Sequence, residues 1–116
     1  MAEIKLPHLA PIKFAKEIIS TTNSSAEVEI EYEQLPSLAM LVEAAAQSCA
    51  ALKTDKNEEA FLVSLKGIKL LQKPTKMRLR ASINEEHRLD KMRYVSFEIF
   101  EDKSCIAEGT LVIALQ

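Results

Sequence analysis

The stretch from Leu35 to Lys53, which reads LPSLAMLVEAAAQSCAALK, places the tightest limit on how this chain can fold. Its residues are typical of a helix, and apolar side chains fall on nearly every side of that helix. A helix from Pro36 to Leu52 is about 25 Å long, and it cannot lie on a surface with half of itself in water. We therefore expect a sheet to wrap around it. Glu43 and Gln47 are the polar exceptions in its middle.

The rest of the chain predicts strands. Ala26 to Glu33 alternate strictly, with apolar side chains on one face and four glutamates on the other, as in a half-buried strand. The short polar connections, among them Ser20–Ser25 and Asn84–Lys91, favour antiparallel neighbours. The other predicted strands are Ile12–Ile19, Ala60–Lys73, Lys76–Ile83, Met92–Phe100 and Cys105–Leu115.

This order predicts a single α+β domain over residues 1–116, in which a mostly antiparallel six-stranded sheet wraps around one long helix. The side of the helix or the edge of the sheet that stays exposed needs a cover. We expect a second copy of the chain to supply it, in a homodimer or a higher assembly.

Charge and composition exclude several classes of protein. The formal net charge is -2, so the chain has no basic excess of the kind that marks a nucleic-acid binder. No signal-peptide pattern or membrane-length apolar run is present, and we expect a soluble, cytoplasmic protein. Its two cysteines, Cys49 and Cys105, have no metal-ligand spacing and are interpreted as small buried hydrophobes. With only two glycines and no phosphate loop, the sequence predicts neither a metal nor a cofactor.

Two segments resemble the 3-hydroxyacyl-acyl-carrier-protein dehydratase family, whose members have the hotdog fold. They are LPHLAP at Leu6–Pro11 and LPSLAMLVEAAAQ at Leu35–Gln47. That family has an LPH segment before its first strand and a helix that reads MPG, a few apolar residues and EAxAQ, which here spans Glu43 to Gln47. The resemblance runs along nearly the whole chain, and it implies a hotdog domain.

The chain departs from the family just before the helix. The family has a loop with a catalytic His there, whereas this chain has only YEQLPS, Tyr32–Ser37, with Ser37 in place of a family Gly. The two histidines do not fill the gap by position. His8 belongs to the LPH segment, which does not carry the family's base, and His87 lies in the charged Asn84–Lys91 stretch, where a solvated imidazole is expected.

The resemblance implies roles for four residues. Glu43 would handle the proton of an acyl thioester, and Gln47, one turn along the same face, would orient Glu43 or a water. Ser37 and Leu38, at the helix start, would offer backbone N–H groups to the thioester oxygen.

Three functions stay open. The first is the removal of water from a 3-hydroxyacyl thioester. The second is hydrolysis of an acyl-carrier-protein or coenzyme A thioester, with Glu43 as base or nucleophile. The third is non-catalytic binding of an acyl chain, or service as a partner subunit of an active hotdog enzyme.

A basic stretch suggests how a substrate would be recruited. Between Ala60 and Asn84 the chain has six basic side chains and no acidic one. Acyl carrier proteins are acidic and coenzyme A carries phosphates, so these residues would steer either of them. The alternative is a solvated strand face balanced by the glutamates of Ala26–Glu33. The candidate docking residues are Lys66, Lys69, Lys73, Lys76, Arg78 and Arg80.

Overall fold

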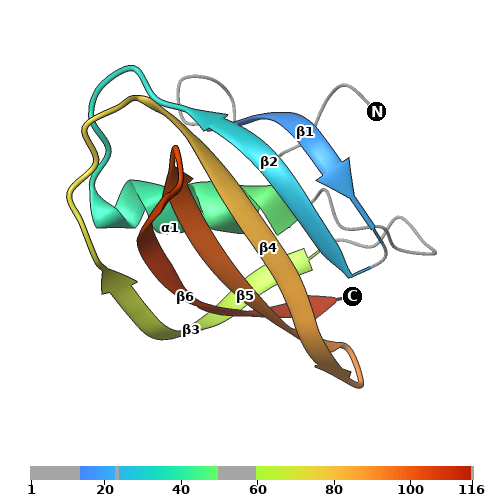
Figure 1. Cartoon of the computed structure of the whole chain (residues 1–116). Helices are drawn as coiled ribbons and strands as arrows, with labels where there is room; N and C mark the ends of the chain where they lie inside the picture. Colours follow the sequence, from blue (N-terminus) through green and yellow to red (C-terminus); the bar gives the residue numbers. More distant parts are fainter. Residues whose placement is uncertain (1–13, 23, 50–59, 116) are drawn as a thin grey trace.

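The computed structural model describes residues 14–22, 24–49 and 60–115. Within them the chain forms one helix and six strands, and each pair of neighbouring strands is antiparallel. The strand order is β1-β2-β4-β5-β6-β3, so β1 and β3 are the edges of the sheet. In Figure 1, α1 lies across one side of the curved sheet, behind β4 and β5. The elements are β1 (Ala15–Thr21), β2 (Ser25–Glu31), α1 (Leu38–Ser48), β3 (Ala60–Leu70), β4 (Arg78–Leu89), β5 (Met92–Glu101) and β6 (Ser104–Leu115).

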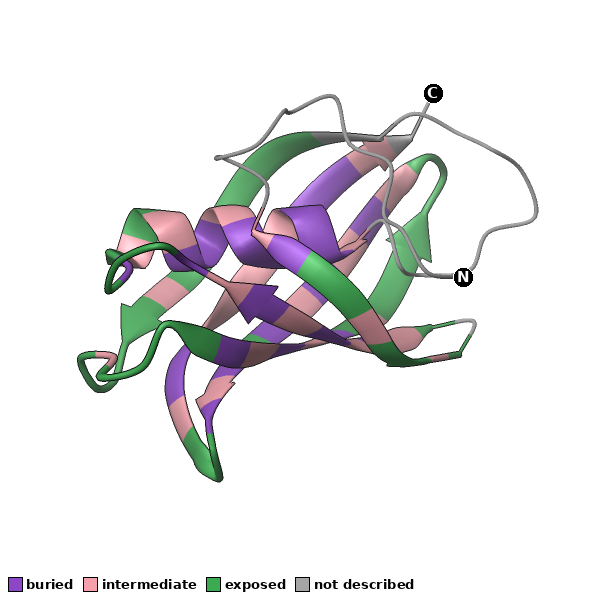
Figure 2. Ribbon diagram, turned by 90° about the horizontal axis from the view of Figure 1, so that it is seen from above, coloured by how far each residue is buried: buried purple, intermediate pink, exposed green. Residues whose placement is uncertain are grey.

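The sheet has an apolar inner face because its strands alternate. In β2, Ala26, Val28 and Ile30 are buried, whereas Glu27 and Glu29 between them are only partly buried. The same period continues across β4 and β5, where Ile83 and Phe97 are cross-strand neighbours on the buried face. Figure 2 shows the buried residues gathered where α1 meets the central strands. The predicted α+β architecture, one helix against a six-stranded antiparallel sheet, is confirmed.

The helix begins two residues later than expected and is covered on one side only. It begins at Leu38, because Ser37 is the N-cap and its Oγ accepts a hydrogen bond from the Met40 N–H at 3.3 Å. Leu41, Ala44 and Ala45 have no exposed surface and face the sheet. On the other side Ala39 is exposed and Glu43 is half-buried.

Several predicted boundaries are wrong. The turn at Ser20–Ser25 is shorter than predicted, since β1 runs to Thr21 and β2 begins at Ser25. β3 ends at Leu70 rather than at Lys73. The predicted helix end at Leu52 and the predicted start of the first strand at Ile12 lie outside the described residues.

The largest error concerns Asn84–Lys91, predicted as a turn and found mostly in β4, which runs to Leu89. Only Asp90 and Lys91 form the turn, and Asp90 has a φ of 58°. The hydrophobic alternation of β4 stops at Ile83 because the β4 side chains from Asn84 to Leu89, in the ribbon that β4 forms with β5, are exposed or only partly buried.

A partly buried ion pair holds the base of this ribbon. Arg93 is 4% exposed, and its Nε donates to Glu85 Oε1 at 2.5 Å. Burial alone raises the pKa of the Glu85 carboxyl, but Arg93 and Arg88 outweigh it and hold that pKa below its usual range. Glu85 thereby neutralises a guanidinium that is almost completely buried.

We predict that Glu85→Ala lowers the free energy of unfolding by about 3 kcal/mol, because it leaves the buried Arg93 charge uncompensated. The matched variant is Arg88→Ala. Arg88 contacts the same carboxylate at 3.3 Å, but its side chain is 44% exposed, so its loss should cost less than about 1 kcal/mol. Urea unfolding measures both variants, and equal costs would contradict the role given to the Arg93 pair.

Candidate functional site

Glu43 and Gln47 lie together on the flank of α1 that the sheet does not fully cover. With Ala39 they follow the i, i+4 spacing of a single helix face. Burial increases along this face toward the C-terminal end of the helix: Ala39 is exposed, Glu43 is half-buried and Gln47 is 3% exposed. The carboxylate therefore lies at the border between solvent and core.

The amide of Gln47 ties the helix to the first strand. Its Oε1 accepts hydrogen bonds from the backbone N–H of Phe14 at 2.8 Å and of Ala15 at 3.1 Å. Because the oxygen faces these two donors, the NH2 group faces the other way, and Nε2 donates to Glu43 Oε1 at 3.2 Å. Gln47 thus contacts Glu43 through its NH2 group and holds the start of β1 through its oxygen.

Ser37 is the N-cap of α1, and Leu38 is its first residue. The Ser37 side chain caps the Met40 N–H, and the Ser37 carbonyl accepts from the Leu41 N–H at 3.0 Å. Helix geometry provides no acceptor for the N–H groups of Leu38 and Ala39 in the first turn. These two donors suit an oxygen that carries partial negative charge.

The small residues of the helix pack against the sheet. Ala44 and Ala45 have no exposed surface and belong to the core, so they do not line an open tunnel within the described part of the chain. Tyr32 is buried near the start of the helix, and its hydroxyl donates a hydrogen bond to the Met40 carbonyl at 3.0 Å. Burial also raises the pKa of the Cys49 thiol to about 12, which keeps it uncharged and unreactive at neutral pH.

Three of the six basic residues form ion pairs with acidic side chains on other strands or turns. Arg78 contacts both Glu29 and Glu31, at 3.0 and 2.9 Å, and Arg80 contacts Glu27. Lys76 Nζ lies 2.6 Å from Asp102. The contacts of Arg78 and Arg80 match the alternative in which the glutamates of β2 balance the basic stretch. Lys66, Lys69 and Lys73 are exposed, and Lys66 Nζ lies 5.6 Å from the centre of the Tyr94 ring.

The described histidine is remote from Glu43. His87 is exposed on β4 and stacks on Tyr94 of β5, with ring centres 4.3 Å apart. Tyr94 lies between the buried Arg93 and Val95, so its ring is on the face of the sheet opposite α1. His8 lies outside the described residues.

The partners of Gln47 at the start of β1 were not predicted. Phe14 lies 33 positions from Gln47 and Ala15 lies 32 positions away, and they contribute only backbone N–H groups, which leave no side-chain signal in a sequence. A hint exists in the helix pattern itself, because an amide on the buried side of a helix must find partners.

We predict that Gln47→Ala lowers the free energy of unfolding by about 1–3 kcal/mol, since it leaves the Phe14 and Ala15 N–H groups without this acceptor. Gln34→Ala is the matched control, because Gln34 is exposed and its loss should change stability by less than about 0.5 kcal/mol. Chemical denaturation followed by circular dichroism measures both. Unchanged stability of Gln47→Ala would show that the amide does not hold β1.

Comparison with known proteins supports the fold. No protein-family model matches the chain, and no curated protein matches it either. Among solved structures, it resembles the dehydratase heterocomplex ApeI:P from Xenorhabdus doucetiae, with 14% identity and a TM-score of 0.76 over 96% of this chain and 88% of that one. It also resembles a mutant of the thioesterase PA1618 from Pseudomonas aeruginosa, with 14% identity and a TM-score of 0.71 over 85% of this chain and 79% of that one.

A third similar structure is the HP0420-homologue from Helicobacter felis, with 19% identity and a TM-score of 0.75 over 97% of each chain. No helix in the described residues has both the length and the apolar character needed to cross a membrane. Two of these similar structures are a dehydratase heterocomplex and a thioesterase. The chain therefore has the hotdog fold that its sequence predicts.

Proposed function

We propose that this chain acts on an acyl thioester at the exposed flank of α1, with Glu43 as its general base in hydrolysis. The observation that carries the proposal is the hydrogen bond from Gln47 Nε2 to Glu43 Oε1, on a helix whose other residues, apart from Ser48, are apolar. Burying a carboxylate costs free energy unless it is hydrogen-bonded or paired. Here the buried amide of Gln47 donates such a hydrogen bond to the half-buried Glu43 and orients it.

The spacing along the helix suits this chemistry. Ala39 and Glu43 lie four residues apart on one face, which is about 6 Å along the axis. A thioester oxygen at the N–H groups of the first turn would place its carbonyl carbon within reach of a water held by Glu43. The carboxylate takes a proton from that water as the oxygen attacks the carbonyl carbon. The C–S bond then breaks, and the protonated Glu43 carboxyl returns its proton to the departing sulfur, so the products are a carboxylic acid and a thiol.

Hydrolysis fits the described residues better than dehydration does. Dehydration needs one group to remove the α-proton and a second to protonate the leaving hydroxyl. Among the described residues, His87 is on the face of the sheet opposite the helix, so it does not supply that second group. Hydrolysis requires a single positioned carboxylate.

In this proposal a second copy of the chain completes the site by covering the exposed edge at β3. β3 is an edge strand, and its side chains on the inner face are not covered by α1, since Leu62 is 43% exposed and Leu65 is 46% exposed. An identical β3 could pair antiparallel along this edge and cover both leucines. Such a homodimer would place its second helix beside the Glu43 flank.

Docking of the thioester carrier is proposed for the three lysines that form no ion pair among the described residues. Lys66 and Lys69 belong to β3, and Lys73 follows it, so all three lie along the proposed dimer edge. Their charges could attract the phosphates of coenzyme A or an acidic acyl carrier protein. Lys76, Arg78 and Arg80 contribute less, because acidic neighbours already offset their charge.

A second candidate function is a non-catalytic partner subunit of an active hotdog dehydratase. The short Tyr32–Ser37 segment, which has no His, favours it. One structure similar to this chain is a dehydratase heterocomplex, and in that role this chain would supply the surface while another supplies the base.

We predict that Glu43→Gln lowers the rate of thiol release from acyl-coenzyme A or acyl carrier protein at least about 100-fold, because the amide keeps the shape but cannot accept the proton. The control is Glu33→Gln, an exposed residue just before the helix, which should keep full activity. Thiol release is followed with a chromogenic disulfide, and the thermal midpoint of each variant checks its fold.

Full activity of Glu43→Gln would contradict the role of this carboxylate. An enoyl product without thiol release would replace hydrolysis by dehydration. The absence of both products with wild-type protein would overturn catalysis and leave the partner-subunit role.

A further inference from the structure

A cavity of about 370 Å³ opens between β3, β5 and β6, away from the Glu43 site. Its walls include Ser96 and Glu98 of β5 and Glu108 and Thr110 of β6. Both glycines of the chain, Gly67 and Gly109, also line it. Gly67 has a φ of +60° at the point where the pairing of β3 with β6 shifts register, and this bulge leaves room beside the strand.

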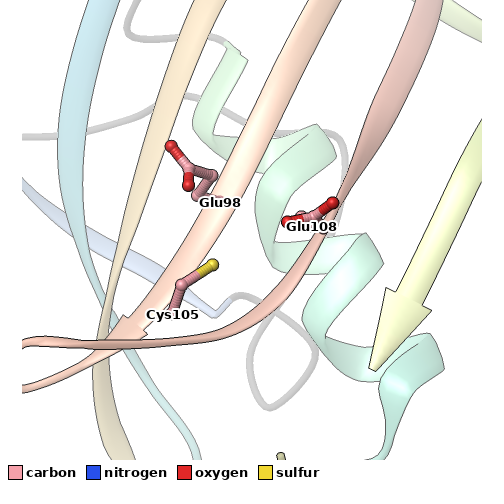
Figure 3. Close-up of side chains that lie close together, drawn as sticks. All are labelled: Glu98, Cys105 and Glu108. Atoms are coloured by element: carbon pink, nitrogen blue, oxygen red, sulfur yellow. The ribbon is translucent and has the colours of Figure 1, made fainter. Parts of the chain in front are cut away.

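Three potential metal ligands converge beside this cavity. Figure 3 shows the side chains of Glu98, Cys105 and Glu108 on the β5–β6 hairpin. One oxygen of each carboxylate and the Cys105 sulfur all lie within 4.8 Å of one another. A tetrahedral zinc ion with bonds of about 2.0–2.3 Å holds its ligand atoms about 3.5 Å apart, so a small rotation of the exposed Glu98 side chain closes the set.

Glu98 and Glu108 repel each other across the β5–β6 pair, and Lys69, the partner of Glu108 on β3, offsets part of that repulsion. Glu98 and Glu108 are direct cross-strand partners, an arrangement that destabilises a sheet when both carry the same charge. The ion pairs found among the described residues use other carboxylates, namely those of Glu27, Glu29, Glu31, Glu85 and Asp102. A divalent cation between Glu98 and Glu108 would turn this repulsion into attraction.

The thiol adds selectivity to the set. A metal that accepts sulfur displaces the thiol proton of Cys105 on binding. Mixed oxygen and sulfur ligands favour zinc over magnesium or calcium, which prefer oxygen alone.

We propose that Glu98, Cys105 and Glu108 bind a zinc-like divalent cation at the edge of this cavity, with water completing its coordination. The sequence does not reveal the site because a hairpin separates Glu98 from Cys105, and only the pairing of β5 with β6 brings them together. The site lies apart from Glu43, so the proposal stands independently of the function proposed above.

Cobalt titration of the full chain tests the proposal, after its metal has been removed by chelation and dialysis. Wild-type protein should bind one equivalent of Co²⁺ with the near-ultraviolet absorption of a thiolate–cobalt bond, and Zn²⁺ should displace it. Cys105→Ser should abolish the absorption and weaken Zn²⁺ binding at least about tenfold. Glu108→Gln should weaken binding similarly while any bound Co²⁺ keeps the thiolate absorption.

Cys49→Ser is the matched control, because it removes the other thiol of the chain, from α1, and should leave the titration unchanged. Circular dichroism of the metal-free variants checks that they fold, and Glu108→Gln keeps the test decisive if Cys105→Ser does not. Wild-type protein that gives no thiolate absorption overturns the proposal. So does an absorption that survives Cys105→Ser and disappears in Cys49→Ser.

Discussion

One packing constraint shapes the rest of this structure: the single short helix of the described residues is too small to cover the whole inner face of a six-stranded sheet. α1 packs against β1, β2, β4, β5 and β6 through Leu41, Ala44 and Ala45, which have no exposed surface. The inward side chains of β3 stay largely uncovered, as the exposure of Leu62 and Leu65 shows. The uncovered flank of the helix and the uncovered strand are the two apolar surfaces on which the functional proposals rest.

Glu43 lies on the flank of α1 where the cover by the sheet ends. Its contact with Gln47 matters both for the fold and for the proposed chemistry. Gln47 accepts hydrogen bonds from two N–H groups at the start of β1 and donates to Glu43, so the docking of the edge strand and the orientation of the carboxylate are coupled. A change that loosens β1 would therefore disturb Glu43 as well. This coupling gives a physical reason for an amide at a position that is 3% exposed.

Sequence patterns predicted the features that repeat locally. The alternation of Ala26–Glu33 and the apolar helix pointed to the fold, and the four-residue spacing of Glu43 and Gln47 pointed to their contact. Contacts between distant segments were not predictable in the same way. Gln47 meets backbone groups of β1, and Arg78 and Arg80 meet glutamates of a strand that is not their neighbour in the chain. The charged Asn84–Leu89 segment was misread because a solvated ribbon has no apolar alternation.

Sedimentation velocity tests most directly the claim that a second copy covers β3. At micromolar concentration we expect wild-type protein to sediment as a dimer and Leu65→Lys, on the exposed inner face of β3, to sediment as a folded monomer. The control is Leu89→Lys, since Leu89 is 60% exposed at the far end of the β4–β5 ribbon, and this variant should stay dimeric. A monomeric wild-type protein, or a dimer that persists in Leu65→Lys, would contradict the account.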